Sequence, residues 1–213
     1  MARIDDFIQA RVLAREGLLE KDINSIIDFS GGVSKADDSG RLRSFLLRFL
    51  NRDVVVTWPE MEFSYNGSVE DVPVQQQVLL LHYLNGVCGP GDMRGKTDWV
   101  SFQDLPEGRF YMDAFMKRAK DPLLRTFGSN PKKMAELAMK LYNARFTDFG
   151  DVSVVVEALP RVPVALVLWQ GDDEFPPEGN LLFDKGISEI LPAEDIALLA
   201  GMVVYPLIGM MKN

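Results

Sequence analysis

The stretch Leu42–Tyr65, LRSFLLRFLNRDVVVTWPEMEFSY, decides the fold class of this chain. It contains three runs rich in apolar, β-branched or aromatic residues, with turn signals between and after them. Strands joined only by turns pair antiparallel, because a parallel pair needs a crossover connection of a dozen or more residues. The strands that we expect are Leu42–Leu50, Val54–Trp58 and Met61–Tyr65.

A second group of strands is predicted later in the chain, at Val152–Ala158 and Val164–Trp169. Shorter strands are expected at Trp99–Phe102 and Asn180–Phe183, whereas the polar, Gly-rich stretch Ser30–Gly40 is typical of an exposed loop. Apolar spacing and capping residues also predict six helices. Two come early, over Ile4–Leu19 and from a capping Asp22 to Ser30, and a third runs from Pro73 to a C′ glycine at Gly86. The others begin at Arg109, cover Pro131–Tyr142 and begin at Pro192.

The order helix, strands, helices, strands, helix predicts an α+β fold in which a mostly antiparallel sheet packs with helices. Since no long linker interrupts the 213 residues, we expect a single domain, with at most a weak two-half organisation around residue 145. A chain of this length can bury roughly 70% of its unfolded surface, so it needs no disulfide or metal to fold.

Composition excludes several classes of protein. With one cysteine and one histidine, the chain alone can form neither a disulfide nor a Cys/His zinc site nor an all-Cys iron–sulfur site. The 31 acidic and 23 basic residues give a net charge of −8, which argues against nucleic acid as a partner. The charged N-terminal stretch is unlike a secretory signal, and we expect a cytoplasmic protein.

The uncharged run Ile196–Met211 contains Gly201, Pro206 and Gly209 and is shorter than the ~20 residues of a membrane span. We therefore expect a buried core helix here and no membrane partner. A contact of this helix with another protein stays open. The sequence does not determine the oligomeric state.

His82 follows three leucines in a predicted helix, so its ring should lie partly against the core. A neutral imidazole can be an axial tetrapyrrole ligand, a single metal ligand or a general base, or it can simply bond to a buried polar neighbour. Cys88 lies six positions after His82. One interpretation is that the two side chains form a nucleophilic Cys–His pair, and the other is that the cysteine is incidental. The stretch Gly89–Gly95 follows a helix instead of a strand, which favours a flexible loop over a phosphate loop.

The most distinctive stretch is WQGDDEFPPEGNLLFD, Trp169–Asp184, where an apolar strand ends in three successive carboxylates. These charges repel one another unless a cation or hydrogen-bond donors offset the repulsion. A hard cation such as Mg²⁺ or Ca²⁺ held by Asp172, Glu174 and Glu178 is one hypothesis. The alternative is a solvated turn whose acids cap a neighbouring segment or pair with arginines.

Four stretches of the chain resemble an uncharacterised family, the domain of unknown function 3786. They are LLLHYLNG (Leu79–Gly86), WVSFQDLPEGRFY (Trp99–Tyr111), LPRVPVALVLWQGDDEFPPEGNLLFD (Leu159–Asp184) and LPAEDIALLAG (Leu191–Gly201). The resemblance implies no established reaction. Members occur mainly in anaerobic bacteria and archaea, and some carry a Cys-rich iron–sulfur extension that this chain lacks. The resemblance further implies a shared framework or site at His82, Phe102, Pro106, Tyr111, Trp169, Asp172, Glu174, Phe175 and Asp184.

From these observations we expect a protein of anaerobic metabolism that binds a small ligand or cofactor in a cleft, with a tetrapyrrole or a divalent cation as candidates. Apolar walls with a few polar groups are typical of such clefts. A metal-dependent or acid/base enzyme and an accessory protein that binds a partner through its apolar terminal helix are the alternatives. The expected walls are Phe102, Tyr111, Trp169 and Phe175, and the expected polar groups are His82, Asp172 and Glu174.

Overall fold

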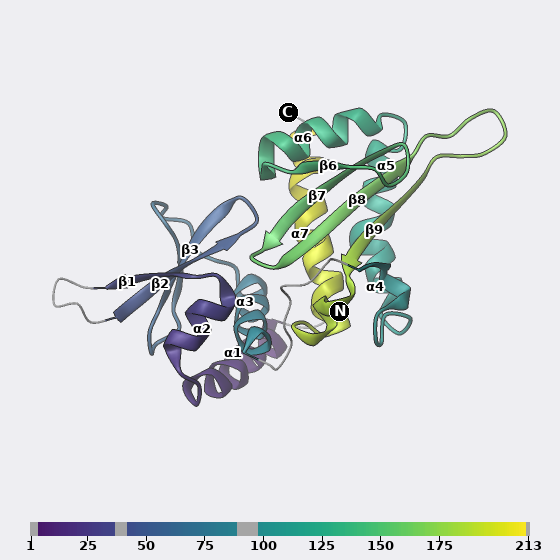
Figure 1. The fold of residues 1–213 in the computed structure, drawn as a ribbon. Coiled ribbons are helices and arrows are strands. Elements are labelled where there is room, and N and C mark those ends of the chain that lie inside the picture. The colour runs from purple at the N-terminus through teal and green to yellow at the C-terminus, as the bar shows by residue number, and fades with distance from the viewer. Residues whose placement is uncertain (1–3, 37–41, 89–97, 212–213) are drawn as a thin grey trace. The chain divides into compact units, whose positions relative to one another are not determined.

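A computed structural model describes residues 4–36, 42–88 and 98–211 (Figure 1). These residues form two compact units. The N-terminal unit comprises the described part of Met1–Asp92 together with Glu189–Leu191, and the C-terminal unit comprises the described part of Met93–Ser188 and Pro192–Asn213. Each unit combines helices with one antiparallel sheet, so the predicted α+β class is confirmed.

The N-terminal unit contains a four-stranded antiparallel sheet in the order β1-β2-β3-β4. The three strands predicted from Leu42 to Tyr65 are confirmed. The prediction of a loop at Ser30–Gly40 is wrong for the part that the structure describes, because β1 pairs there with β2. Residues 37–41 of that loop lie outside the described residues. The strands are β1 (Val33–Ala36), β2 (Leu42–Phe49), β3 (Arg52–Thr57) and β4 (Phe63–Tyr65).

The helices of this unit are α1 (Ile4–Leu19), α2 (Ile23–Ser30) and α3 (Val74–Val87). As predicted, Asp22 caps α2, where its Oδ2 accepts a hydrogen bond from Ser25 N at 2.8 Å. The prediction of Gly86 as a C′ residue is wrong, because α3 continues through it to Val87. Gly86 is needed for close packing instead, since a Cβ atom there would lie 2.0 Å from the carbonyl oxygen of Ile190.

The C-terminal unit contains a five-stranded antiparallel sheet in the order β5-β9-β8-β7-β6. Four of these strands match the predicted ones, whereas β6 was not expected because three residues carry too little pattern. Leu166 and Val167 point to opposite faces of β8 and are both fully buried, so β8 is covered on both sides. The strands are β5 (Trp99–Ser101), β6 (Arg145–Thr147), β7 (Val152–Leu159), β8 (Val162–Trp169) and β9 (Glu178–Asp184).

The helical segments between and after these strands are η1 (Phe102–Asp104), α4 (Met112–Phe115), η2 (Met116–Lys120), α5 (Asp121–Phe127), α6 (Pro131–Tyr142), η3 (Lys185–Glu189) and α7 (Ala193–Met211). Most apolar side chains of α7 between Ile196 and Leu207 are buried, as expected for a core helix. By length and composition α7 is the one described helix that could cross a membrane, but half of it is buried and core helices pass the same test.

The segment η2 is a π-helical turn inserted between α4 and α5. Its position has a local cause in the sequence, because Pro122 has no N–H group to bond the carbonyl of Arg118 in a continuous α-helix. A change to π-helical bonding is one of the few ways in which a helix accommodates such a break. The segment η2 also packs against α7. Gly201 of α7 permits this close approach, because a Cβ atom at Gly201 would be 3.2 Å from Arg118 O.

Candidate functional site

The seven residues expected at a common site are divided between the two units. His82 lies in the N-terminal unit and the other six lie in the C-terminal unit. His82 is half-buried on α3 and has an interaction partner. A tetrapyrrole or general-base role for His82 therefore stays a prediction.

Phe102 is a core residue whose side chain is 1% exposed. Its ring stacks on Phe115 with centroids 4.4 Å apart and meets the edge of Phe183 at 6.1 Å. Tyr111 lies outside this cluster and donates a hydrogen bond to Glu194 at 3.5 Å. Loss of solvation, followed by the charge of Glu194, raises the pKa of the Tyr111 phenol.

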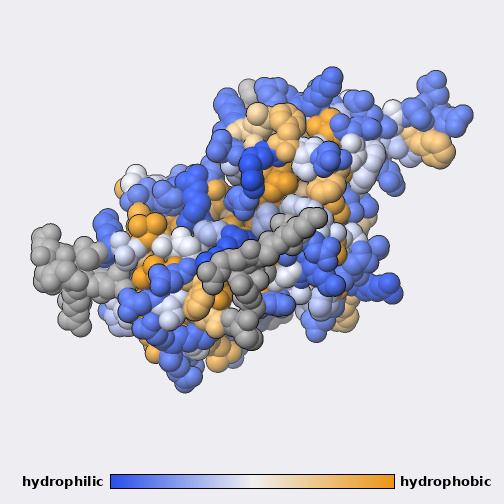
Figure 2. Space-filling view, in the orientation of Figure 1, coloured by the Kyte–Doolittle hydropathy of each residue, from blue (hydrophilic) through white to orange (hydrophobic). Residues whose placement is uncertain are grey.

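Asp172, Glu174 and Phe175 lie in the exposed loop that joins β8 to β9 and extends beyond the sheet in Figure 1. The loop carries hydrophobic beside hydrophilic side chains (Figure 2). Asp172 Oδ1 accepts hydrogen bonds from the backbone N–H groups of Phe175 at 2.7 Å and Glu174 at 2.9 Å. These bonds lower the pKa of Asp172, so backbone donors stabilise this carboxylate locally.

This loop and Phe102 lie at opposite ends of β9. Trp169, which is 38% exposed, pairs with Glu178 at one end, while Phe102 packs on Phe183 near the other. Five residue steps separate Glu178 from Phe183, or roughly 17 Å in an antiparallel strand. The C-terminal unit therefore does not bring Phe102 and the acidic loop into one cavity.

The acidic loop also lacks the arrangement of a metal site. Within the described ranges, no three or more His, Cys, Asp or Glu side chains are grouped so that they could hold a metal ion. This finding does not support the hypothesis that Asp172, Glu174 and Glu178 hold a hard cation. Cys88 caps the end of α3, and burial raises the pKa of its thiol, which disfavours the reactive thiolate. The Gly89–Gly95 stretch lies outside the described residues.

A pocket opens where β5 ends beside β9. Ser101, the last residue of β5, pairs with Leu182, so a longer β5 would place Gln103 opposite Asn180. The chain instead turns away at Phe102 into η1, and this part of the edge of β9 is left without a neighbouring strand. Helix α4 and η2 cover the gap, which encloses a cavity of about 110 Å³.

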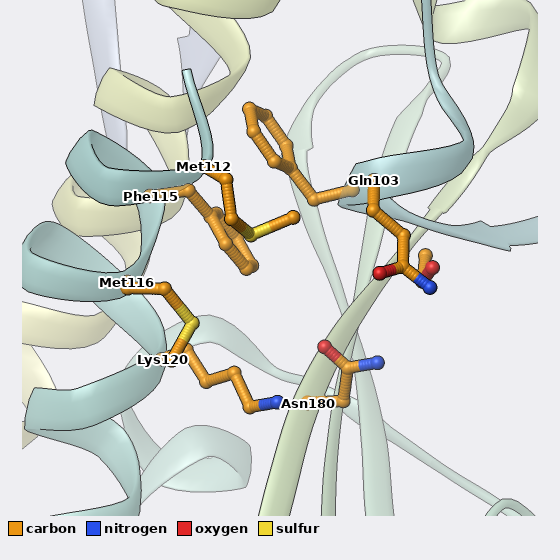
Figure 3. Close-up of a pocket in the computed structure, with 8 residues that line it drawn as sticks. Gln103, Met112, Phe115, Met116, Lys120 and Asn180 are labelled. Carbon is orange, nitrogen blue, oxygen red and sulfur yellow. The ribbon is translucent and has the colours of Figure 1, made fainter. Parts of the chain in front are cut away.

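Figure 3 shows how the residues around this pocket are arranged. Met112, Phe115 and Met116 come from the helical side, and Gln103 and Asn180 come from η1 and the edge of β9. The side chain of Lys120 extends from the end of η2 toward Asn180. Ser101 and Phe102 complete the lining.

Gly108 holds the η1 side of the pocket in place. The chain folds back on itself after η1, with hydrogen bonds from Leu105 N to Phe102 O and from Gly108 N to Leu105 O. A Cβ atom at Gly108 would lie 1.9 Å from Phe102 O. Only glycine permits this approach, which explains the LPEG part of the motif quoted for Trp99–Tyr111.

The polar side chains of the pocket are the feature that points to a ligand. Among the described residues, neither Lys120 nor the Gln103 side-chain amide has a hydrogen bond or ion pair. The Oδ1 atom of Asn180 accepts a bond from Leu181 N at 3.0 Å, which leaves its Nδ2 group as a donor. Gln103, Lys120 and Asn180 border one cavity beside the buried Phe102–Phe115 stack.

A second cavity, of about 370 Å³, lies between α6 and the β6–β7 pair. Its Ser153 and Asp151 side chains are used within the chain, whereas Lys132, which is exposed, has no hydrogen bond or ion pair among the described residues. Ser153 Oγ donates to Thr147 O and accepts from Phe149 N, and Asp151 accepts from Gln170 N at 2.7 Å. Phe146 in its wall is 65% exposed, which is typical of a shallow surface. The pocket beside η2 is the stronger candidate.

Sequence reasoning found Phe102 but missed the other residues of this pocket. Gln103 lies within a quoted motif, and Phe115 lies on a helix face that the apolar spacing identified. Lys120 and Asn180 had no such signal, because single lysines and asparagines are common on protein surfaces. Pro122 was the one clue that the helix changes its hydrogen bonding beside Lys120.

The fold is α+β, and its C-terminal unit contains a small cavity of mixed polar and apolar lining. The family model of the domain of unknown function (DUF3786) matches residues 22–205, most of the chain. The chain therefore belongs to this family, as its motifs predict. No curated protein and no solved structure matches the chain.

Proposed function

We propose that the protein binds a small molecule in the pocket formed by the end of β5, η1, η2 and the edge of β9. The observation that carries this proposal is the Lys120 ammonium, which borders the cavity without a partner among the described residues. An ammonium group carries three hydrogen-bond donors and a positive charge, which an acceptor or an anion in the cavity can satisfy. A bound ligand supplies that partner here.

Two features of the surrounding structure support the proposal. The wall that carries Met116 and Lys120 is π-helical, and π-helical turns occur frequently at functional sites. The lining also brings the polar side chains of Gln103, Lys120 and Asn180 together beside Met112 and Met116, so a small ligand would meet both polar and apolar groups. The class of function is the one expected from the sequence, but of the expected site residues only Phe102 borders this pocket.

Methionine methyl groups provide the test, because Met112 and Met116 border the pocket and Met139 lies exposed on α6 in the same unit. We would record methyl NMR spectra of the full chain, labelled at methionine, during titrations with acetate, acetamide and methylammonium. The proposal predicts that at least one probe shifts the Met112 and Met116 signals saturably while Met139 stays fixed. If no probe shifts either signal at tens of millimolar, the proposal is wrong.

A further inference from the structure

We infer that the ligand of this pocket is a small carboxylate with a short apolar tail. This inference rests on the proposed function and names the class of molecule that the same site would take. It follows from three properties of the lining, namely its charge, its hydrogen-bond donors and its apolar volume.

The charge of the pocket is positive. Lys120 is the single charged residue among the eight that line it, and no carboxylate is among them. The nearest acidic neighbour along η1, Asp104, accepts a hydrogen bond from Ser101 Oγ at 2.5 Å and does not border the cavity. Since the chain as a whole carries a charge of −8, an uncompensated ammonium here is a local feature that favours an anion.

The hydrogen-bond donors match the oxygen atoms of a carboxylate. Asn180 has an Nδ2 donor in addition to the Oδ1 that accepts from Leu181 N, and Gln103 supplies a second amide, with its own donor, at the exposed mouth. Together with Lys120 these groups provide donors for an acceptor that has two oxygens and about four lone-pair positions. A cationic ligand would find no anionic partner in this lining.

The volume restricts the rest of the ligand. A cavity of about 110 Å³ is smaller than the ~300–1,000 Å³ of typical drug-sized ligand sites, so it suits a molecule of few atoms. A tetrapyrrole or a nucleotide is far larger than this cavity, which could not enclose either of them. Met112, Met116 and Phe115 form an apolar wall, against which the methyl or ethyl tail of a short carboxylic acid would pack.

The experiment compares acetate and propionate with acetamide, which has similar size and no charge. Binding to the full chain is followed through the methyl signals of Met112 and Met116, for wild type, Lys120→Met and Lys117→Met. Lys117 lies on the same π-helical segment but is exposed and does not line the pocket, so its variant is the matched control. Lys120→Arg tests whether charge at this position is sufficient.

We expect both carboxylates to bind wild type and Lys117→Met equally, and to bind Lys120→Met about tenfold more weakly or worse, with partial recovery in Lys120→Arg. Propionate should bind more tightly than acetate because of its longer tail. If acetamide binds as tightly as acetate, or if Lys120→Met binds carboxylates like wild type, the inference is overturned while the proposed function stands. If none of the probes shifts the two methyl signals, the proposed function itself is wrong.

Discussion

Replacing Gly108 by alanine tests how the pocket is built. The added Cβ atom would lie 1.9 Å from Phe102 O, 3.0 Å from Phe102 C and 3.1 Å from Leu105 O. Ordinary contacts begin near 3.4 Å, so the closest pair must separate by about 1.5 Å. All three neighbouring atoms belong to the backbone, which cannot rotate away as a flexible side chain can. The turn after η1 must therefore move, together with Phe102 and Gln103.

The expected cost follows from overpacking, which typically destabilises a protein by ~1–3 kcal/mol. In a chain of this size each kcal/mol lowers the melting temperature by ~2–4 °C, so Gly108→Ala should lower it by roughly 2–12 °C. The assay is thermal unfolding, combined with methyl NMR of Met112 and Met116, whose signals should move because Phe102 lines the same cavity.

Gly209→Ala is the matched control, because a Cβ atom at this helical glycine has no neighbour within 4 Å. Alanine is the better helix former, so the control should be as stable as wild type or up to ~1 kcal/mol more stable. A Gly108→Ala protein with an unchanged melting temperature and unchanged Met112 and Met116 signals would refute the reasoning about this turn.

Three further predictions concern the C-terminal unit. Leu166→Ala should destabilise the protein by ~2–5 kcal/mol, because Leu166 is fully buried in β8; thermal unfolding within a degree of wild type would contradict this. Tyr142→Phe should cost ~0.5–1.5 kcal/mol in denaturant unfolding, because it removes the 2.8 Å hydrogen bond to Val203 O between α6 and α7, and an unchanged midpoint would speak against that bond. The lowered pKa of Asp172 means that its contribution to the loop is present above pH 3.8 and is lost as the pH falls through the lowered value. NMR titration of the Asp172 carboxyl should therefore give a midpoint below 3.8, with the Glu174 and Phe175 amide signals moving together with it, and a midpoint at or above 3.8 would show that these bonds do not form.

Much of the fold could be predicted because its signals are local. Leu42–Tyr65 shows β-strand composition between turn residues, and Pro131–Tyr142 has a capping Asn130, an early proline and helical apolar spacing. Such signals depend on neighbouring residues only. They failed for β1, which has the short polar sequence VSKA and is a strand because β2 pairs with it.

The site could not be predicted in the same way, because its residues meet through tertiary structure. Gln103 and Asn180 border one gap only because β5 pairs with β9 and then turns away after Ser101. The carboxylate of Asp172, in the loop after Trp169, instead stabilises its own turn, which is a local role that an acidic run does not reveal. The distinctive stretches thus identified the family better than the lining of the pocket.

The central claim is that a small carboxylate occupies the pocket between η2 and β9. The most direct measurement is of intermolecular NOEs between the methyl protons of propionate and the methionine methyl groups of the wild-type chain. We predict NOEs to Met112 and Met116, which border the cavity, and none to the exposed Met139. Saturable binding of propionate with NOEs to Met139 but none to Met112 or Met116 would contradict the account.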